Sequence, residues 1–249
     1  MYIDTHCHIS NEDYEDINLI IKENREAKID KIIVSGCTRD GIKESLNLSK
    51  KYDDMFVTIG YHPSEADITS KIDLIELEKH LLDDKIVGIG EIGLDYHYGK
   101  ENIEEQKELF RRQLDLAKKY NKPVVIHTRD AFLDTYNILK EYDLTGIIHC
   151  FSGSLESAKM YMNIGYYLGI GGVVTFKNSK LKDVIKEIGL DRIVFETDSP
   201  YLSPFRGNKN EPCNVKYICK YVSELLNLTY EEVCEKTTIN ASKVLKLTI

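Results

Sequence analysis

The sequence predicts an α/β fold, a single-domain (β/α)8 TIM barrel that takes up the whole of residues 1–249. Two observations predict it: eight short apolar, β-branched runs, and amphipathic helical stretches between most of them. The runs lack regular polar alternation, as expected for parallel strands buried on both faces. Beyond this alternation we find no internal repeat, low-complexity segment or linker, so we expect one domain.

Each expected strand is a short run rich in Val, Ile, Tyr or Phe. In chain order the strands are expected at residues 2–6, 31–36, 56–62, 86–93, 123–128, 146–151, 166–171 and 192–198. The amphipathic stretches lie at residues 11–28, 103–120, 154–164, 179–188, 214–226 and 230–246. In the clearest, 103–120, four apolar residues share one stripe: Ile103, Phe110, Leu114 and Ala117. Thr229 is expected to cap the last helix, and residues 199–212 form a loop after the eighth strand.

The composition is that of a globular protein, with 42% hydrophobic and 30% charged residues. A net charge of −8 argues against wrapping of duplex nucleic acid, but it permits a small site that grips one phosphate through metal ions. No apolar stretch approaches the about 20 residues of a membrane helix, and no secretion signal is visible. The six cysteines lack CxxC spacing and are expected to be reduced thiols. We expect a cytoplasmic monomer without membrane association.

Two histidines at the end of the first strand raise the question of function. His6 and His8 are two residues apart, so their side chains share one face of the strand while Cys7 points away. In (β/α)8 barrels the carboxyl ends of the strands form the active-site mouth. Five further residues that can bind metal or phosphate are expected at other strand ends: His62, Glu91, His127, His149 and Asp198.

Imidazole nitrogens and carboxylates around one cavity form a site for divalent metal. Leaving His62 aside, six candidate ligands exceed the needs of one tetrahedral ion and suit two ions about 3.5–4 Å apart, bridged by a carboxylate. Glu91 is the best bridge, because its strand lies between those that supply the other ligands. A single barrel histidine is usually a hydrogen-bonded core residue, but five of the seven histidines end strands, and core packing does not explain that convergence. His80 and His97 fit no such position.

The chain resembles the TatD family of metal-dependent deoxyribonucleases, within the amidohydrolase-like barrels. The resemblance rests on segments that follow the family's order along almost the whole chain: IDTHCHI (3–9), GYHP (60–63), GEIGLDY (90–96), Gln106, PVVIHTRDA (123–131), HCFSG (149–153), ETDSPYL (196–202) and RGNKNEP (206–212). It implies a barrel that hydrolyses DNA phosphodiester bonds at a two-metal centre. One metal would be held by His6, His8, Glu91 and Asp198, and the second by Glu91, His127 and His149. The metals can be Mg²⁺, Mn²⁺, Zn²⁺ or Co²⁺, since mixed nitrogen and oxygen ligands accept each of them.

In such a mechanism Asp198 is expected to be both a ligand and the general base, and Glu91 the bridging ligand. His62 is expected to bind the scissile phosphate or to protonate the leaving oxygen, or else to make a structural hydrogen bond beside Pro63. Arg129 is expected to pair with phosphate, or else to form a salt bridge with Asp130 or Glu91.

Residues outside the ligand set are candidates for contacts with a nucleic acid. In the loop after the eighth strand, Arg206 and Lys209 are expected to follow the backbone of the substrate, or else to be solvated charges. Four aromatic residues near the mouth are candidates for stacking on bases, or else for packing: Tyr61, Tyr96, Tyr201 and Phe205.

Single-stranded or frayed 3′ ends of DNA are the expected substrate, since an acidic body suits a strand held at one end. The alternative enzyme is a two-metal hydrolase of a small amide, ester or phosphoester. Relatives of that kind commonly bridge their metals with a lysine, and Glu91 in that position favours the nuclease. A metal-stabilised binding protein without activity is a third possibility, which the complete ligand set argues against.

Overall fold

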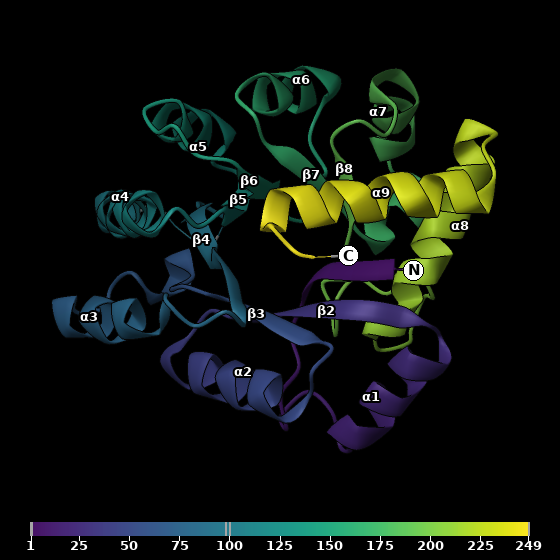
Figure 1. The fold of residues 1–249 in the computed structure, drawn as a ribbon. Helices are drawn as coiled ribbons and strands as arrows, with labels where there is room; N and C mark the ends of the chain where they lie inside the picture. Colours follow the sequence, from purple (N-terminus) through teal and green to yellow (C-terminus); the bar gives the residue numbers. More distant parts are fainter. Residues whose placement is uncertain (1, 98, 100, 249) are drawn as a thin grey trace.

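The computed structural model, which describes residues 2–97, 99 and 101–248, is an eight-stranded parallel barrel surrounded by helices (Figure 1). Each strand pairs with the next along the chain, in the order β1 to β8. The strands are β1 (Tyr2–Cys7), β2 (Ile29–Gly36), β3 (Met55–Ile59), β4 (Ile86–Asp95), β5 (Val124–Arg129), β6 (Gly146–Ile148), β7 (Tyr167–Ile170) and β8 (Ile193–Phe195). The predicted (β/α)8 fold is confirmed.

Helices form the outer layer of the barrel. They are α1 (Ile17–Glu26), α2 (Arg39–Lys51), α3 (Lys71–His80), α4 (Ile103–Tyr120), α5 (Phe132–Leu139), α6 (Leu155–Asn163), α7 (Leu181–Ile188), α8 (Val215–Leu226) and α9 (Tyr230–Leu245). The described residues also form three short 3-10 helices: η1 (Pro63–Glu65), η2 (Gly172–Thr175) and η3 (Pro212–Asn214). Of the helices, α2, α3 and α5 were not among the predicted stretches. The predicted helix at 11–28 was too long at its start, because the Asp16 carboxylate caps the backbone N–H groups of Asn18 and Leu19.

Helix α4 has the predicted bounds but a more polar buried face. Phe110, Leu114 and Ala117 are buried as the stripe predicts, whereas Ile103 is only half-buried. Two buried glutamines, Gln106 and Gln113, share that face. Their amides bond to backbone groups: Gln106 bonds to the N–H and C=O of Asp95, and Gln113 to those of Tyr61. Helix α4 therefore fixes the two loops at the carboxyl ends of β3 and β4.

Strands β1 and β8 close the barrel through contacts around a buried carboxylate. Asp4 in β1 accepts hydrogen bonds from the backbone N–H of Thr197 at 2.9 Å and from its hydroxyl at 2.6 Å. Beyond β8, the Asp198 N–H donates to the His6 carbonyl, and the His8 N–H donates to the Ser199 carbonyl. This seam joins the two ends of the sequence beside the histidine pair of β1.

Helix α9 covers the opposite end of the barrel, where the strands begin (Figure 1). Ala241, Val244 and Leu245 pack against a small cluster of strand residues that fill the barrel floor: Ile3, Ile33, Val87, Ile147, Tyr167 and Val194. The helix begins at the predicted cap, Thr229, whose hydroxyl accepts from the Glu232 N–H while the Glu232 carboxylate accepts from the Thr229 N–H. With this end closed, the carboxyl ends of the strands form the open mouth.

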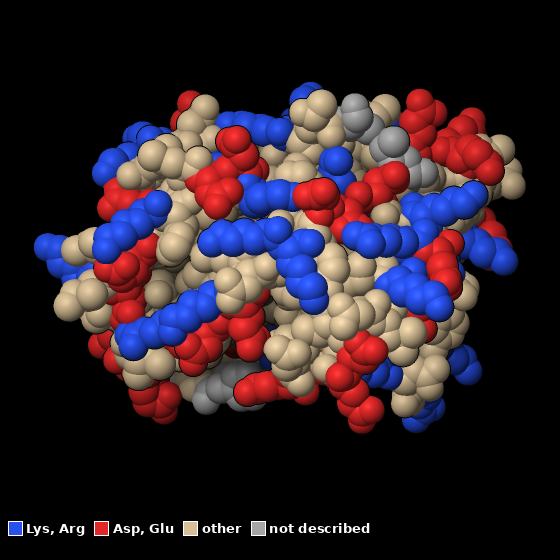
Figure 2. All heavy atoms as spheres, turned by 60° about the horizontal axis from the view of Figure 1, so that its bottom comes forward, with Lys and Arg blue, Asp and Glu red and all other residues tan. Residues whose placement is uncertain are grey.

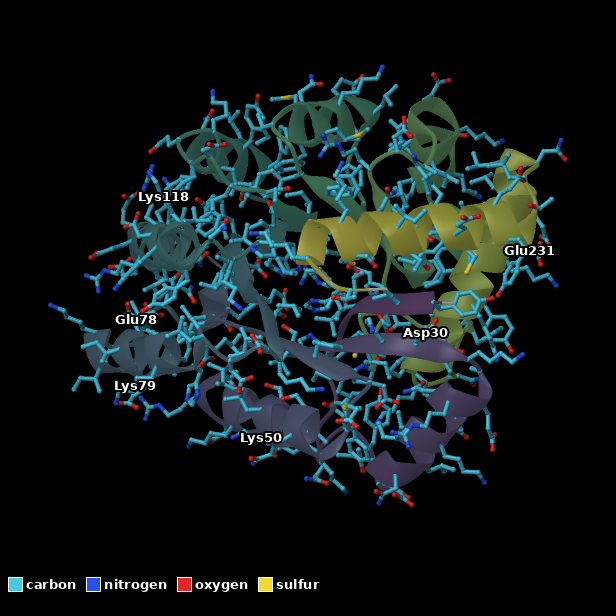
Figure 3. All side chains as sticks on the ribbon, in the orientation of Figure 1. Asp30, Lys50, Glu78, Lys79, Lys118 and Glu231 are labelled. Atoms are coloured by element: carbon cyan, nitrogen blue, oxygen red, sulfur yellow. The ribbon has the colours of Figure 1, made fainter. Side chains whose placement is uncertain are left out.

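Charged side chains of both signs are interspersed on the outer surface. Figure 2 shows Lys and Arg next to Asp and Glu over one face of the molecule. The labelled Lys50, Lys79 and Lys118 lie on the outer side of the helix layer in Figure 3 and are exposed. Within the described residues, no helix has the length and apolar character needed to span a membrane.

Candidate metal centre

The histidine pair at the carboxyl end of β1, His6 within the strand and His8 just beyond it, lies at the mouth. His6 is fully buried, and its Nε2 lies 3.3 Å from the Nε2 of His8. Cys7 points the other way, with its thiol donating to the Ile33 carbonyl. The alternation of side chains along β1 therefore brings both imidazoles to one side, as their spacing predicts.

Glu91 lies between two groups of imidazoles. Its Oε2 is 3.4 Å from the Nε2 of His6 and 3.7 Å from that of His8. Its Oε1 is 2.7 Å from the Nδ1 of His127 and 3.5 Å from the Nε2 of His149. The residue was predicted at the end of its strand, but β4 continues to Asp95, and Glu91 lies in its interior. One carboxylate thus presents a different oxygen to each histidine pair.

His127 in β5 lies between two carboxylates. Its Nδ1 faces Glu91, and its Nε2 is 3.1 Å from the Oδ2 of Asp95. Gly93 allows this approach of β4 to β5, because a Cβ at that position would lie 2.0 Å from the His127 carbonyl oxygen. Asp95 was missed from sequence; it lies four residues after Glu91 on the same face of a strand that is longer than predicted.

His149 directly follows β6 and is also oriented by a carboxylate. Its Nδ1 lies 3.0 Å from the Oε1 of Glu196, a fully buried residue that also accepts from the Cys150 N–H at 2.6 Å. Its Nε2 is left facing the Oε1 of Glu91. A carboxylate on the second nitrogen is the usual partner of a metal-binding imidazole. Glu196 was also missed, although its alternation with Asp198 in the sequence ETD is a signal for it.

Asp198 closes the site from the side of β8. It lies three residues beyond the end of β8 rather than at the predicted strand end, in a left-handed conformation with φ of 55°. Its Oδ1 is 3.8 Å from the Nε2 of His6, 3.7 Å from that of His8 and 3.8 Å from that of His149. The neighbouring Thr197 is held by Asp4 across the seam, which fixes the position of the Asp198 carboxylate.

The electrostatics of the cluster favour positive charge. Burial lowers the pKa of His149, but Glu196, Glu91 and Asp198 outweigh it and raise that pKa to about 10. Burial likewise lowers the pKa of His127, but the hydrogen bonds of this imidazole to Asp95 and Glu91 outweigh it and raise that pKa to about 9. Burial raises the pKa of Glu91, yet the imidazoles hold it well below its usual value.

The pKa values of two other groups of the cluster, His8 and Asp198, shift toward the neutral form of each group. Burial and the neighbouring His6 lower the pKa of His8 to about 4. Burial raises the pKa of Asp198 to about 6 against the attraction of His149 and His6. Because their pKa values lie above 7, the imidazoles of His127 and His149 carry protons that a bound cation can replace.

Distances between the polar atoms fit a metal ion. A tetrahedral site with metal–nitrogen bonds of about 2.1 Å places its ligand atoms about 3.4 Å apart. The separations of 3.3 Å between His6 and His8, 3.4 Å from His6 to Glu91 and 3.5 Å from His149 to Glu91 match this edge. Imidazole and carboxylate are also the donor types that divalent transition metals accept. The residues therefore fit divalent metal.

A cavity of about 620 Å³ opens above this cluster. The ligand-type residues His8, Glu91, His127, His149 and Asp198 line its floor. The cavity gives a substrate access to the candidate metal ligands.

Of the residues predicted to bind substrate, His62 and Arg129 line the cavity and Arg206 does not. His62 is three residues beyond β3 rather than in it, and it caps η1, which begins at Pro63. Its Nδ1 accepts from the Ser64 N–H, and its Nε2 is 3.9 Å from Glu91. Arg129 ends β5, is exposed and lines the cavity. Arg206 is exposed in the loop 199–212, outside the cavity lining.

The candidate aromatic residues divide into two groups. Tyr61 is buried, the Tyr96 hydroxyl donates to Asp134 at 2.8 Å, and neither residue lines the cavity. Tyr201 and Phe205 are exposed by 58% and 40%.

The remaining candidates lie outside the cluster. Lys209 donates to the backbone carbonyl of Asp13. The imidazoles of His80 and His97 lie elsewhere, on the exposed end of α3 and beside Asp130.

Comparisons with known proteins show the family to which the chain is similar. The family described as TatD related DNase matches residues 3–246. The chain is 42% identical to the uncharacterized metal-dependent hydrolase YabD of Bacillus subtilis, over 99% of this chain and all of that protein. It is 32% identical to the uncharacterized metal-dependent hydrolase YcfH of Escherichia coli, over 97% and 94% of the two chains.

Solved structures extend the comparison. YjjV, a TatD homologue from Escherichia coli, superposes with a TM-score of 0.92 at 31% identity, over 99% of this chain and 98% of that one. A TatD family hydrolase from Entamoeba histolytica has a TM-score of 0.88 at 24% identity, covering 99% and 98%, which shows the shared fold. With its barrel, its buried cluster of imidazoles and carboxylates and these matches over nearly its full length, the chain belongs to the TatD family of metal-dependent hydrolases.

Proposed function

We propose that this hydrolase is a deoxyribonuclease that cleaves phosphodiester bonds at single-stranded or frayed ends of DNA, with two divalent metal ions. The observation that carries the proposal is the division of ligands at Glu91, whose Oε2 faces His6 and His8 while its Oε1 faces His127 and His149. Two ligand groups that share one carboxylate suit the two-metal centres of phosphoester hydrolases.

The two ions share Glu91 and otherwise have separate ligands in this proposal. His6, His8, Glu91 and Asp198 would hold one ion, and Glu91, His127 and His149 the other. When bound, the ions supply Lewis-acid stabilisation of charge on the phosphoryl oxygens and make water more acidic. Asp95 and Glu196 orient the imidazoles of His127 and His149 for this role.

Asp198 accepts the proton of the attacking water. Its carboxylate lines the cavity, and the contact of Asp4 with Thr197 keeps it there. The water oxygen forms a bond to phosphorus, the bond from phosphorus to the leaving sugar oxygen breaks, and the proton of the water passes to Asp198. The leaving oxygen takes its proton from solvent.

His62 binds the phosphate rather than protonating the leaving oxygen. Because its Nδ1 accepts from the Ser64 N–H, the neutral ring carries its proton on Nε2, the nitrogen on the side of Glu91. Burial lowers the pKa of His62 to about 4, so the ring is neutral at pH 7 and donates a hydrogen bond without giving up its proton. Arg129, on the cavity wall, supplies a positive charge to a phosphoryl oxygen.

The experiment uses labelled single-stranded and duplex oligonucleotides, each with Mg²⁺, with Mn²⁺ and with EDTA. We expect metal-dependent shortening of the single strand and slower cleavage of the blunt duplex. Asp198→Asn is expected to lower turnover by about 10²–10⁴-fold, because the base is lost. Oligonucleotides that stay intact in every metal condition, alongside hydrolysis of a small ester or phosphoester, would establish the small-molecule alternative instead.

A further inference from the structure

Three exposed aromatic side chains lie in the loop that follows β8 and at the start of α8. Tyr201 lines the cavity, and its ring centroid is 6.1 Å from that of His8. Phe205, in the same loop, meets Tyr217 of α8 edge to face at a centroid distance of 4.8 Å. These rings are exposed by 58%, 40% and 41%. We call Tyr201, Phe205 and Tyr217 the aromatic platform.

The loop that carries the platform is held in place by internal bonds. Asn210 is fully buried, and its amide donates to the carbonyls of Thr197 at 2.8 Å and Tyr201 at 2.7 Å. The Asn210 carbonyl in turn accepts from the Tyr14 hydroxyl. Gly172 of η2 packs directly on the Leu202 carbonyl, where a Cβ would lie 2.1 Å away. The rings are therefore exposed on a fixed surface, and large apolar side chains fixed in that way usually mark a binding site.

The segments that carry the platform contain more basic than acidic residues, in a chain of net charge −8. Residues 199–217 contain Arg206, Lys209 and Lys216 against one carboxylate, Glu211. The adjoining residues 171–180 contain two lysines and no carboxylate. Lys216 lies over the Tyr217 ring, with its Nζ 5.1 Å from the centroid.

Acidic side chains line the other sides of the mouth. The cavity wall beyond His8 carries Glu12, Asp13, Asp40 and Glu44. A second cavity of about 420 Å³ on the far side of His62 is lined by Asp67, Asp95, Glu101 and Glu105. These carboxylates repel a phosphate backbone, so the side of β7 and β8 is the favourable exit for a polyanion.

We propose that the aromatic platform stacks the unpaired bases next to the scissile phosphodiester, with Arg206 near the backbone of the same strand. Aromatic rings interleaved with cations are the common means of binding single-stranded nucleic acid without sequence preference. The inference rests on the proposed nuclease function and assigns the direction in which the strand leaves the metal centre. It also accounts for a preference for frayed ends, because paired bases present no free face for stacking.

The test compares two substrates in Phe205→Leu and Tyr217→Leu. One is a single-stranded oligonucleotide and the other is bis(p-nitrophenyl) phosphate, which has no nucleobase. We expect the ratio of kcat/KM for the oligonucleotide to kcat/KM for the small ester to fall about tenfold in each variant, through KM. Phe205→Trp is expected to restore the ratio. An unchanged ratio in both leucine variants overturns the platform.

Tyr52→Leu is the matched control. Tyr52 also has a lysine over its ring, with the Nζ of Lys51 at 4.9 Å, but it follows α2 at the opposite end of the barrel. In Tyr52→Leu, the ratio of kcat/KM for the oligonucleotide to kcat/KM for the small ester is expected to equal that of the unchanged protein.

A second measurement separates failure of the platform from failure of the proposed function. In EDTA, a single strand containing 2-aminopurine, whose fluorescence falls on stacking, is titrated with the protein and with Phe205→Leu. We expect quenching by the protein and at least fivefold weaker binding by the variant. If the unchanged protein leaves all oligonucleotides intact, the nuclease proposal fails, and this titration still decides the platform: equal quenching by both proteins, or none, overturns it.

Discussion

At position 91 one carboxylate faces five imidazoles: its Oε2 faces His6 and His8, and its Oε1 faces His127, His149 and, at 3.9 Å, His62. Such a buried group is costly unless charges or a metal compensate it, and here the imidazoles hold its pKa well below the ordinary value. The same side chain thereby links the two histidines at the carboxyl end of β1 to His127 in β5 and His149 after β6. Its removal is expected to disconnect the two halves of the site.

We predict that Glu91→Ala abolishes high-affinity binding of two metal ions and lowers turnover to background, while the barrel stays folded. The physical reason is that this one substitution removes both the Oε2 that faces His6 and His8 and the Oε1 that faces His127 and His149. Metal content after dialysis and the far-ultraviolet circular dichroism spectrum measure the two effects. Glu44→Ala is the control, because it removes a carboxylate that lines the same cavity but is not one of the candidate metal ligands. Normal turnover in Glu91→Ala contradicts the two-metal mechanism.

The side chains that orient the candidate ligands were harder to predict than the ligands. The histidines of β1 were identified from their spacing, because alternation along a strand fixes which face they share. Asp95 in β4 contacts His127 in the neighbouring β5, and Glu196 after β8 contacts His149 after β6, at separations of 32 and 47 residues in the sequence. No local pattern encodes such a pair, so only the register of the barrel identifies it.

At the scale of elements, the start of α3 is fixed by a reciprocal capping box. The Ser70 hydroxyl accepts from the Asp73 N–H, and the Asp73 carboxylate accepts from the Ser70 N–H and hydroxyl. Arg39 of α2 also pairs with this carboxylate, so it joins two helices. These hydrogen bonds and then the charge of Arg39 lower the pKa of Asp73 below its usual value.

We predict that Asp73→Asn destabilises the protein by about 1 kcal/mol at pH 7 and by progressively less in acid. A carboxyl with a depressed pKa in the folded state contributes stability above its unfolded pKa of about 3.9, and that contribution is lost as the pH falls through the folded value. Urea unfolding of both proteins between pH 7 and pH 3 measures the difference. Asp84→Asn, at an exposed position, is the control. A difference that does not shrink below about pH 4 contradicts the assignment.

Helix α9 stabilises the floor of the barrel through a few apolar contacts. Leu245 is 1% exposed and packs into the cluster formed by the strand residues at that end. We predict that Leu245→Ala lowers the free energy of unfolding by about 3 kcal/mol without changing KM, because the cavity it leaves lies at the end opposite to the mouth. Lys243→Ala, on the exposed side of the same helix, is expected to change it by less than about 0.5 kcal/mol. Equal stability of the two variants would show that α9 does not close the barrel.

For the whole molecule, bound metal is expected to add to stability, since an ion that binds only the folded protein shifts the unfolding equilibrium. At a free concentration of 100 times Kd the gain is about 2.7 kcal/mol, which corresponds to a rise in Tm of about 5–10 °C for a chain of this size. Thermal melts in EDTA and in Mn²⁺ measure the shift, and Glu91→Ala is expected to show none. An unchanged Tm in the unmodified protein contradicts a metal site in the mouth.

The sequence by itself determined the (β/α)8 architecture, because buried parallel strands leave short apolar runs and amphipathic helices leave periodic patterns, and both depend only on neighbouring residues. It also identified the imidazoles of the mouth and two of its carboxylates, Glu91 and Asp198, since the strands of such a barrel all end at one face. Only the tertiary structure decided that Glu91 divides its oxygens between two histidine pairs, that Tyr61 is buried while Tyr201 is exposed, and that Asp4 positions the segment before Asp198. These contacts join strands and loops distant along the chain, and their geometry is set by barrel closure rather than by local sequence.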